Sequence, residues 1–167
     1  FDSSLHYYRI ALPLWRQLDD PEGQARVSGH MALMLWHLGE LREALSLSEE
    51  SILLKRIIGD SLDLAKALNN HGLILRKLGR YDASLLFLQE ALLIKETIAV
   101  PAASICNAYT NIGVLYWRLK NYPMAQANFD KAIAIAKAAN YQKGLANGNN
   151  NLGLMANEQE KYAEALQ

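Results

Sequence analysis

LNNHGLILRKLGRY, residues 68–81, belongs to a pattern that recurs along the chain at a fixed spacing. Four segments align without a gap: HMALMLWHLGELREAL (30–45), NHGLILRKLGRYDASL (70–85), NIGVLYWRLKNYPMAQ (111–126) and NLGLMANEQEKYAEAL (151–166). Small residues at 32, 72, 113 and 153 are spaced by 40, 41 and 40 positions. A second small set at 44, 84, 125 and 165 keeps that spacing, so the chain is predicted to be a repeat protein.

Each repeat is predicted to form two antiparallel helices. The first carries apolar residues at helical spacing, such as Leu68, Ile74, Leu75 and Leu78. A short break follows in every copy, at Gly39, Gly79, Lys120–Asn121 or Glu160. The second helix is then expected to begin at Leu41, Tyr81, Tyr122 or Tyr162. Because such short breaks permit only an antiparallel return, we expect an all-α solenoid of helix pairs, with about eight helices and no strand.

The repeat period assigns the whole chain to one array. Residues 1–20 are expected to be the second helix of a preceding repeat, followed by repeat 1 at 21–60, repeat 2 at 61–100, repeat 3 at 101–141 and a truncated repeat 4 at 142–167. The sequence has no initiator Met, so we interpret it as a fragment of a larger protein and expect any targeting signals to lie outside it.

Composition narrows the class of protein. The 17 basic residues balance 17 acidic ones, which does not favour nucleic acid as a partner. No apolar run approaches the roughly 18 residues of a membrane span, so no membrane partner is expected. The single cysteine, Cys106, excludes an internal disulfide and suits a reducing compartment, and we expect the protein to be cytoplasmic.

The pattern G-x6-G-x-Y-x-x-A, followed by an Ala-Leu pair, resembles the tetratricopeptide repeat. The best matches are Gly72, Gly79, Tyr81 and Ser84 in one copy, and Gly113, Tyr122 and Ala125 in the next. The common repeat has about 34 residues; the longer period here is similar to the long-helix form of kinesin light chains, LGN-type polarity adaptors and bacterial regulators. The resemblance implies a right-handed superhelix whose concave inner wall is lined by the first helices.

Equivalent positions of the first helices give the expected inner wall. The candidate groove residues are Asn70, Asn111, Asn151, Asn69, Asn150, Arg26, Lys66, Asn107, Asn147, Arg76, Trp117 and Trp36. A carboxamide can pair with both groups of a peptide unit. In long-helix tetratricopeptide proteins an inner asparagine holds the main chain of a bound segment, and Asn70, Asn111 and Asn151 fall on the matching position. The alternative is that these amides brace neighbouring helices or cap turns.

Charge and aromatic residues suggest what the groove would bind. The first-helix ranges 24–38, 64–78 and 104–119 contain basic residues and no Asp or Glu, which predicts a basic wall that favours acidic segments. Trp36 and Trp117 flank Arg76 in one set of equivalent positions, and Trp and Arg are frequent interface anchors. Alternatively, either Trp packs between helices.

The sequence offers no recognisable catalytic or metal site. His6, His30, His37 and His71 lack a Cys or carboxylate at ligand spacing, and there is no glycine-rich phosphate loop. His71 and Cys106 are expected to pack in the core. We therefore predict a non-enzymatic protein that needs no cofactor.

Three functions remain open on these grounds. The favoured one is an interaction scaffold that binds an extended, acidic protein or peptide segment as the docking or sensing part of a larger protein. A second is an intramolecular regulatory domain that restrains an attached enzyme or DNA-binding domain. A third is structural self-association, and end-to-end contact of the fragment through Tyr162, Ala165 and Leu166 is expected.

Overall fold

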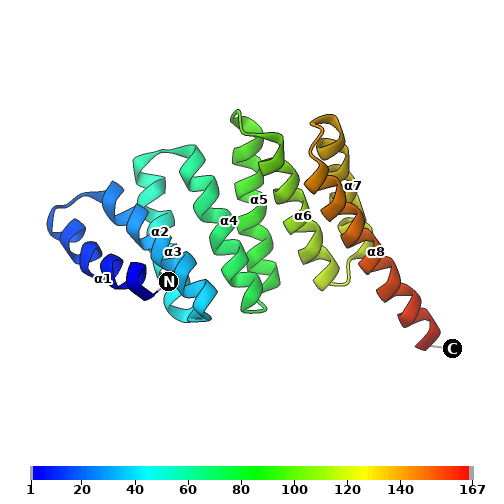
Figure 1. The fold of residues 1–167 in the computed structure, drawn as a ribbon, viewed down its shortest axis with the longest axis horizontal. Coiled ribbons are helices and arrows are strands. Elements are labelled where there is room, and N and C mark those ends of the chain that lie inside the picture. The colour runs from blue at the N-terminus through cyan, green and yellow to red at the C-terminus, as the bar shows by residue number, and fades with distance from the viewer. Residues whose placement is uncertain (1, 166–167) are drawn as a thin grey trace. The chain divides into compact units, whose positions relative to one another are not determined.

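The computed structural model describes the backbone of residues 2–165 and the side chains of residues 3–160. This part of the chain forms eight α-helices and contains no strand, which confirms the predicted all-α repeat fold (Figure 1). The helices are α1 (Asp2–Gln17), α2 (Pro21–Leu38), α3 (Leu41–Ile58), α4 (Ser61–Lys77), α5 (Tyr81–Thr97), α6 (Ala102–Arg118), α7 (Tyr122–Ala138) and α8 (Gln142–Ala165).

Most helix ends follow directly from local sequence. The side chains of Asp20, Asp60 and Asn121 accept hydrogen bonds from backbone N–H groups in the first turns of α2, α4 and α7. Gly39 ends α2 with φ 86°, a left-handed conformation that favours glycine. The predicted starts at Leu41, Tyr81 and Tyr122 are confirmed.

The predicted break at Glu160, with a new helix from Tyr162, is wrong. Helix α8 is continuous from Gln142 to Ala165, and its ribbon is unbroken in Figure 1. The residues around this position, NEQEKY, are mostly good helix formers and include neither Gly nor Pro. The corresponding breaks after α2 and α4 contain Gly39 and Gly79, both with positive φ.

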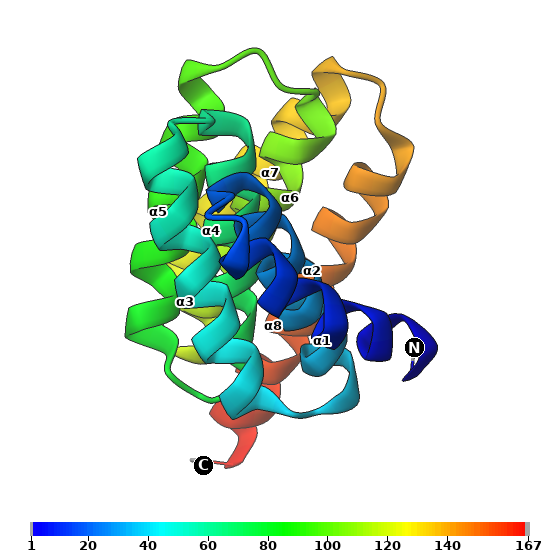
Figure 2. The ribbon, with the colours of Figure 1, turned by 90° about the vertical axis from the view of Figure 1, so that its left-hand side faces the viewer.

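The chain divides into two compact units, Phe1–Ile94 and Lys95–Gln167. In the first unit α2 lies against α3, and both views of the ribbon show them side by side (Figure 2). Leu12, Met31, Leu35, Leu47 and Ile74 belong to one apolar cluster in its core. In the second unit α6 packs on α7, with Phe129 fully buried. None of the described helices has the length and apolar character that crossing a membrane requires.

Small residues on the first helices set the distance to the second helices. A Cβ atom at Gly72 would lie 2.8 Å from Cδ2 of Leu88, and one at Gly113 would lie 2.7 Å from Cε1 of Phe129. Real Cβ atoms do not approach other atoms so closely, so a larger residue would push the helices apart. Gly72 also accepts a hydrogen bond of 2.6 Å from the Ser84 hydroxyl at its carbonyl.

The two candidate reactive residues of the sequence are core residues, as predicted. His71 is 1% exposed, and its ring meets that of Phe87 edge-on, with the ring centroids 4.4 Å apart. Cys106 is also 1% exposed, and its thiol donates to the carbonyl of Ala132 at 3.3 Å. Burial raises the pKa of the Cys106 thiol, which disfavours the reactive thiolate.

Candidate functional site

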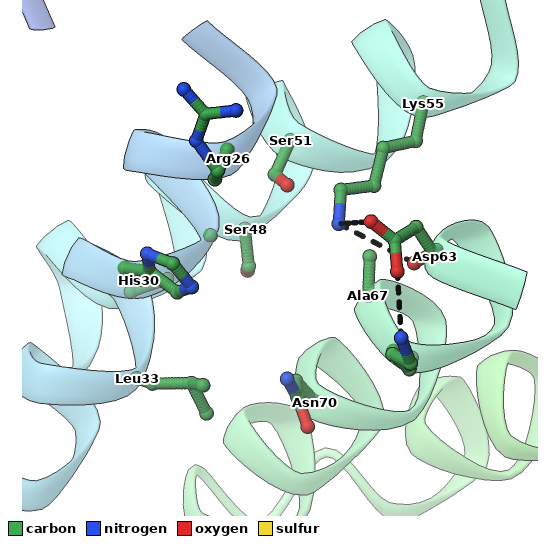
Figure 3. A pocket seen from close by; sticks show the side chains of 12 residues that line it. Arg26, His30, Leu33, Ser48, Ser51, Lys55, Asp63, Ala67 and Asn70 are labelled. Carbon is green, nitrogen blue, oxygen red and sulfur yellow. Dashed lines mark hydrogen bonds and ion pairs between the residues drawn. The ribbon is translucent and has the colours of Figure 1, made fainter. Parts of the chain in front are cut away.

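A cavity of about 370 Å³ lies within the first unit, between helices α2, α3 and α4. Arg26, Gly29, His30, Ala32 and Leu33 line it from α2; Ser48, Ser51 and Lys55 from α3; and Asp63, Lys66, Ala67 and Asn70 from α4. Figure 3 shows Arg26 and His30 on one side of the cavity and Lys55 and Asp63 on the other. Side chains from three helices thus converge on one space.

An ion-pair cluster occupies one wall of the cavity. Nζ of Lys66 lies 2.8 Å from Oδ1 of Asp63, and Nζ of Lys55 lies 3.9 Å from Oδ2. Lys55 also donates to the backbone carbonyl of Asp63 at 3.4 Å. The hydrogen bond from Lys66 is the main reason that the pKa of Asp63 is lowered, so this carboxylate is ionised at neutral pH.

The opposite wall carries a positively charged residue, Arg26, and a neutral one, His30. Arg26 extends along α2 with its guanidinium carbon 5.7 Å from the centre of the Trp15 ring. Burial, followed by the charges of Lys55 and Arg26, lowers the pKa of His30, so its imidazole is neutral at pH 7. Burial likewise lowers the pKa of Lys55, whose partner Asp63 opposes this shift.

The cavity is therefore suited to an anionic group. Lys55 and Lys66 pair with the single carboxylate of Asp63, Arg26 lines the opposite wall, and the Asn70 amide adds donors and an acceptor. The Lys55 side chain is only 14% exposed, whereas that of Lys66 is 57% exposed and can reorient toward a ligand. A carboxylate placed here would share the lysines with Asp63 and gain charge-assisted hydrogen bonds.

The structure brings three of the sequence-predicted groove residues together: Arg26, Lys66 and Asn70 all line this cavity. Asn69 and Arg76 are half-buried on the same helix, α4. Trp36 is half-buried on α2 against the core cluster, with Lys77 Nζ 5.7 Å from its ring centre. Its indole Nε1 is buried without a hydrogen-bond partner among the described residues.

The remaining predicted residues lie on α6 and α8 in the second unit. Asn111 and Asn151 are half-buried, whereas Asn107, Asn147 and Asn150 are exposed. Trp117 is half-buried, and its Nε1 donates to Oε2 of Glu158 at 2.9 Å, which joins α6 to α8. Glu158 also pairs with Lys120.

The predicted inner asparagines Asn70, Asn111 and Asn151 differ from Asn128 and Asn149 in their hydrogen bonds. Asn128 and Asn149 donate to carbonyls four residues earlier in their own helices, at 2.8 Å in both cases. Within residues 3–160, no side-chain hydrogen bond joins Asn70, Asn111 or Asn151 to another residue. In the free chain these three amides can therefore bond to water or to a ligand.

Sequence reasoning missed two charged residues of the cavity, Lys55 and Asp63. The acid-free range 64–78 was too short, because α4 begins at Ser61 and carries Asp63 into the wall. The i,i+3 spacing of Asp63 and Lys66 was the available signal for this ion pair. Lys55 lies on a second helix, whereas the candidates were taken from first helices only.

The described residues contain no group of three or more His, Cys, Asp or Glu side chains arranged to hold a metal ion. The cavity holds one titratable imidazole, His30, which is neutral and flanked by cations.

Comparisons with known proteins agree with this architecture. The family profile described as tetratricopeptide repeat matches residues 23–97 and 104–167. No curated protein matches the sequence. Among solved structures, BtubC (BKLC) from P. vanneervenii has 20% identity and a TM-score of 0.79, with 83% of this chain and 57% of that chain covered. The apo form of RapI has 21% identity and a TM-score of 0.82, and the match covers 91% of this chain and 42% of RapI.

A third similar structure, NprR in complex with its cognate peptide NprX, has 22% identity and a TM-score of 0.66, with 98% of this chain and 46% of that chain covered. The chain thus spans about half the length of these proteins, and the likeness to them is one of fold. The family profile covers most of the sequence, with the small-residue spacing and helix pairing described above. The chain belongs to the tetratricopeptide repeat family.

Proposed function

We propose that this chain is a protein-interaction module that binds an extended, acidic segment of a partner protein. The observation that carries the proposal is the cavity between α2, α3 and α4, which is lined by three cationic side chains, Arg26, Lys55 and Lys66, and by one carboxylate, Asp63. An acidic side chain of the partner would enter there. The Asn70 amide beside it would hold the partner's main chain.

The same amide position recurs on first helices of the second unit. Asn70, Asn111 and Asn151 occupy equivalent positions on α4, α6 and α8, and all three are half-buried. An extended peptide presents alternating N–H and C=O groups at regular intervals. An amide at this position suits such a ligand, because it pairs with the ligand's backbone and leaves the ligand's side chains free to vary.

Similar structures give the proposal a precedent. NprR is solved in complex with its cognate peptide NprX, and a Rap protein is solved in complex with Competence and Sporulation Factor. Both share the helical-repeat fold with this chain at 22% and 18% identity. In both cases a protein with this fold has been solved with a bound peptide or factor. The residues assigned to binding here come from this chain's own cavity.

The test is fluorescence anisotropy with two labelled probe peptides. One has Glu at alternate positions, and the other has Gln in their place; both are about ten residues long, which spans on the order of 30 Å when extended. We expect the Glu peptide to bind more tightly and its affinity to fall as salt rises. Equal affinity of the two peptides, or no binding of either, would contradict the proposal.

Matched variants locate the contact. Replacing Arg26 or Lys66 with Gln is expected to weaken binding of the Glu peptide by about tenfold, because each removes a charge from a partly enclosed site. Arg42→Gln is the control, since Arg42 is exposed on α3 and does not line the cavity. A segment of a longer parent protein would use the same cavity; in that case the isolated chain would bind the peptide and the parent protein would exclude it.

A further inference from the structure

Two equivalent tryptophans differ in what their indole N–H groups contact. Trp36 and Trp117 occupy the same position of the repeat, four residues after the small residue of a first helix. Nε1 of Trp117 donates to Oε2 of Glu158 at 2.9 Å, whereas Nε1 of Trp36 is buried and has no acceptor among residues 3–160. A buried N–H group without an acceptor costs stability, and such groups are rare in folded proteins. Trp36 is therefore a donor whose acceptor has to be identified.

The second unit shows which chemical group satisfies the donor at this position. Glu158 lies on α8, one repeat after Trp117, and its Oε2 accepts the hydrogen bond from the indole. The other oxygen of the same carboxylate, Oε1, pairs with Nζ of Lys120. One carboxylate thus binds an indole N–H and an ammonium group together. Because the acceptor is ionised, these hydrogen bonds are stronger than bonds between neutral groups.

In the first unit the position equivalent to Glu158 carries a cation. Glu158 follows Trp117 by 41 positions, and the residue 41 positions after Trp36 is Lys77. Nζ of Lys77 lies 5.7 Å from the centre of the Trp36 ring, and the lysine is exposed. An indole donor and an ammonium group are therefore neighbours here, as they are in the second unit. No carboxylate among the described side chains accepts from this indole.

We propose that a carboxylate of the bound partner segment fills this position, where it accepts a hydrogen bond from Nε1 of Trp36 and pairs with Lys77. The inference rests on the proposed function and gives the acidic segment a second contact. Leu33, which lines the cavity, precedes Trp36 by three residues, or about 5 Å along α2, so one segment can reach both places. Because Nε1 is buried, a neighbouring side chain has to move first, and the exposed Lys77 can reorient.

The first test supplies the carboxylate from within the chain and needs no ligand. Lys77→Glu places an acid at the position equivalent to Glu158, and Lys77→Met is the matched control, because its side chain has no oxygen. The chain has three tryptophans, so the spectrum of Trp36→Phe assigns the indole N–H resonance of Trp36 in proton–nitrogen NMR spectra. We expect this resonance to lie further downfield in Lys77→Glu than in Lys77→Met. The same resonance position in both variants would overturn the proposed site.

The second test uses the two probe peptides. The Glu peptide should move the Trp36 resonance downfield, whereas the resonance of Trp117, which already has an acceptor, should change little. Trp36→Phe keeps an aromatic ring without the N–H and should weaken binding of the Glu peptide by about fivefold or more.

The Lys66→Gln variant separates this contact from the proposed function. If Lys66→Gln weakens binding of the Glu peptide while Trp36→Phe binds it as tightly as the parent chain does, the segment uses the cavity and the second contact is wrong. If the Glu peptide does not bind the parent chain at all, the proposed function and this contact fail together. Weaker binding in both variants, with the Trp36 resonance shifted by the Glu peptide and not by the Gln peptide, is the expected result.

Discussion

The hydroxyl oxygen of Ser48 lies 2.7 Å from Nδ1 of His71, which joins α3 to α4 inside the core of the first unit. The single hydroxyl hydrogen of Ser48 is already donated to the carbonyl of Leu45, also at 2.7 Å. Ser48 therefore accepts a hydrogen bond from His71, and the neutral imidazole carries its proton on Nδ1. A polar pair thus replaces apolar packing here: His71 is equivalent to Met31 and Ile112 in the neighbouring repeats.

The buried imidazole should make folding stability depend on pH. Burial lowers the pKa of His71 from 6.5 to about 4, so the unfolded chain binds a proton between these values and the folded chain does not. The contribution of His71 is fully present above pH 6.5 and is lost as the pH falls toward 4, by up to about 3 kcal/mol. Urea unfolding at pH 7, 6 and 5 measures this loss.

A variant without the imidazole is the control for that measurement. His71→Leu should flatten the fall in unfolding free energy between pH 7 and 5, because the variant has no imidazole at this position. If the variant and the parent chain lose stability in parallel over this range, His71 is not the group responsible.

The same pair should show strong coupling between its two members. Ser48→Ala leaves the buried Nδ1–H of His71 without an acceptor, which should cost about 1–3 kcal/mol of unfolding free energy. In the double variant Ser48→Ala/His71→Leu neither polar group remains, so it should be more stable than Ser48→Ala alone. A double variant whose loss equals the sum of the two single losses would contradict the assigned hydrogen bond.

The fold could be predicted from sequence because it depends on local and periodic signals. Helical spacing and glycine or asparagine breaks located the starts of α3, α5 and α7, and the small-residue spacing identified the helix pairing. The break at Glu160 was inferred from repeat equivalence alone. Local residues there favour helix, and α8 continues to Ala165.

The cavity could be predicted only in part. Equivalent positions brought Arg26, Lys66 and Asn70 into one candidate set, since residues at one repeat position share a face. Lys55 and Asp63 reach the cavity from a second helix and from the first turn of α4, and their convergence depends on how three helices pack. For Trp117, the bond to Glu158, 41 positions away, also arises only once α6 and α8 are neighbours.

The effect of close helix packing on stability can be tested by comparing the unfolding free energies of Gly113→Ala and Gly153→Ala. At Gly113 the new methyl group would lie 2.7 Å from the ring of Phe129, which is fully buried and cannot move aside. Gly113→Ala should therefore destabilise the chain by about 1–3 kcal/mol. At Gly153 the methyl group meets nothing within 4 Å, and Gly153→Ala should stabilise α8 by up to about 1 kcal/mol. Denaturant midpoints at low protein concentration compare the two; a change of the same sign in both would contradict this interpretation of the packing.

The last prediction concerns the inner asparagines. If Asn70 and Asn111 hold the main chain of a bound segment, replacing either with Ala should weaken binding of the Glu probe peptide. The loss of one neutral hydrogen-bond partner in a ligand-covered site costs roughly 1–3 kcal/mol, or about five- to a hundredfold in affinity. The unfolding free energy should change much less, because neither amide has a side-chain hydrogen bond to another residue among residues 3–160.

Asn128→Ala is the control for an asparagine that stabilises the fold, because Asn128 is 9% exposed and its amide donates to the carbonyl of Met124. This replacement should lower the unfolding free energy and leave the affinity of the folded chain unchanged. Anisotropy titrations and urea unfolding of all three variants separate the two roles. If Asn70→Ala and Asn111→Ala instead behave as Asn128→Ala does, the inner amides brace the helices, and binding of an extended segment would rest on the charged cavity alone.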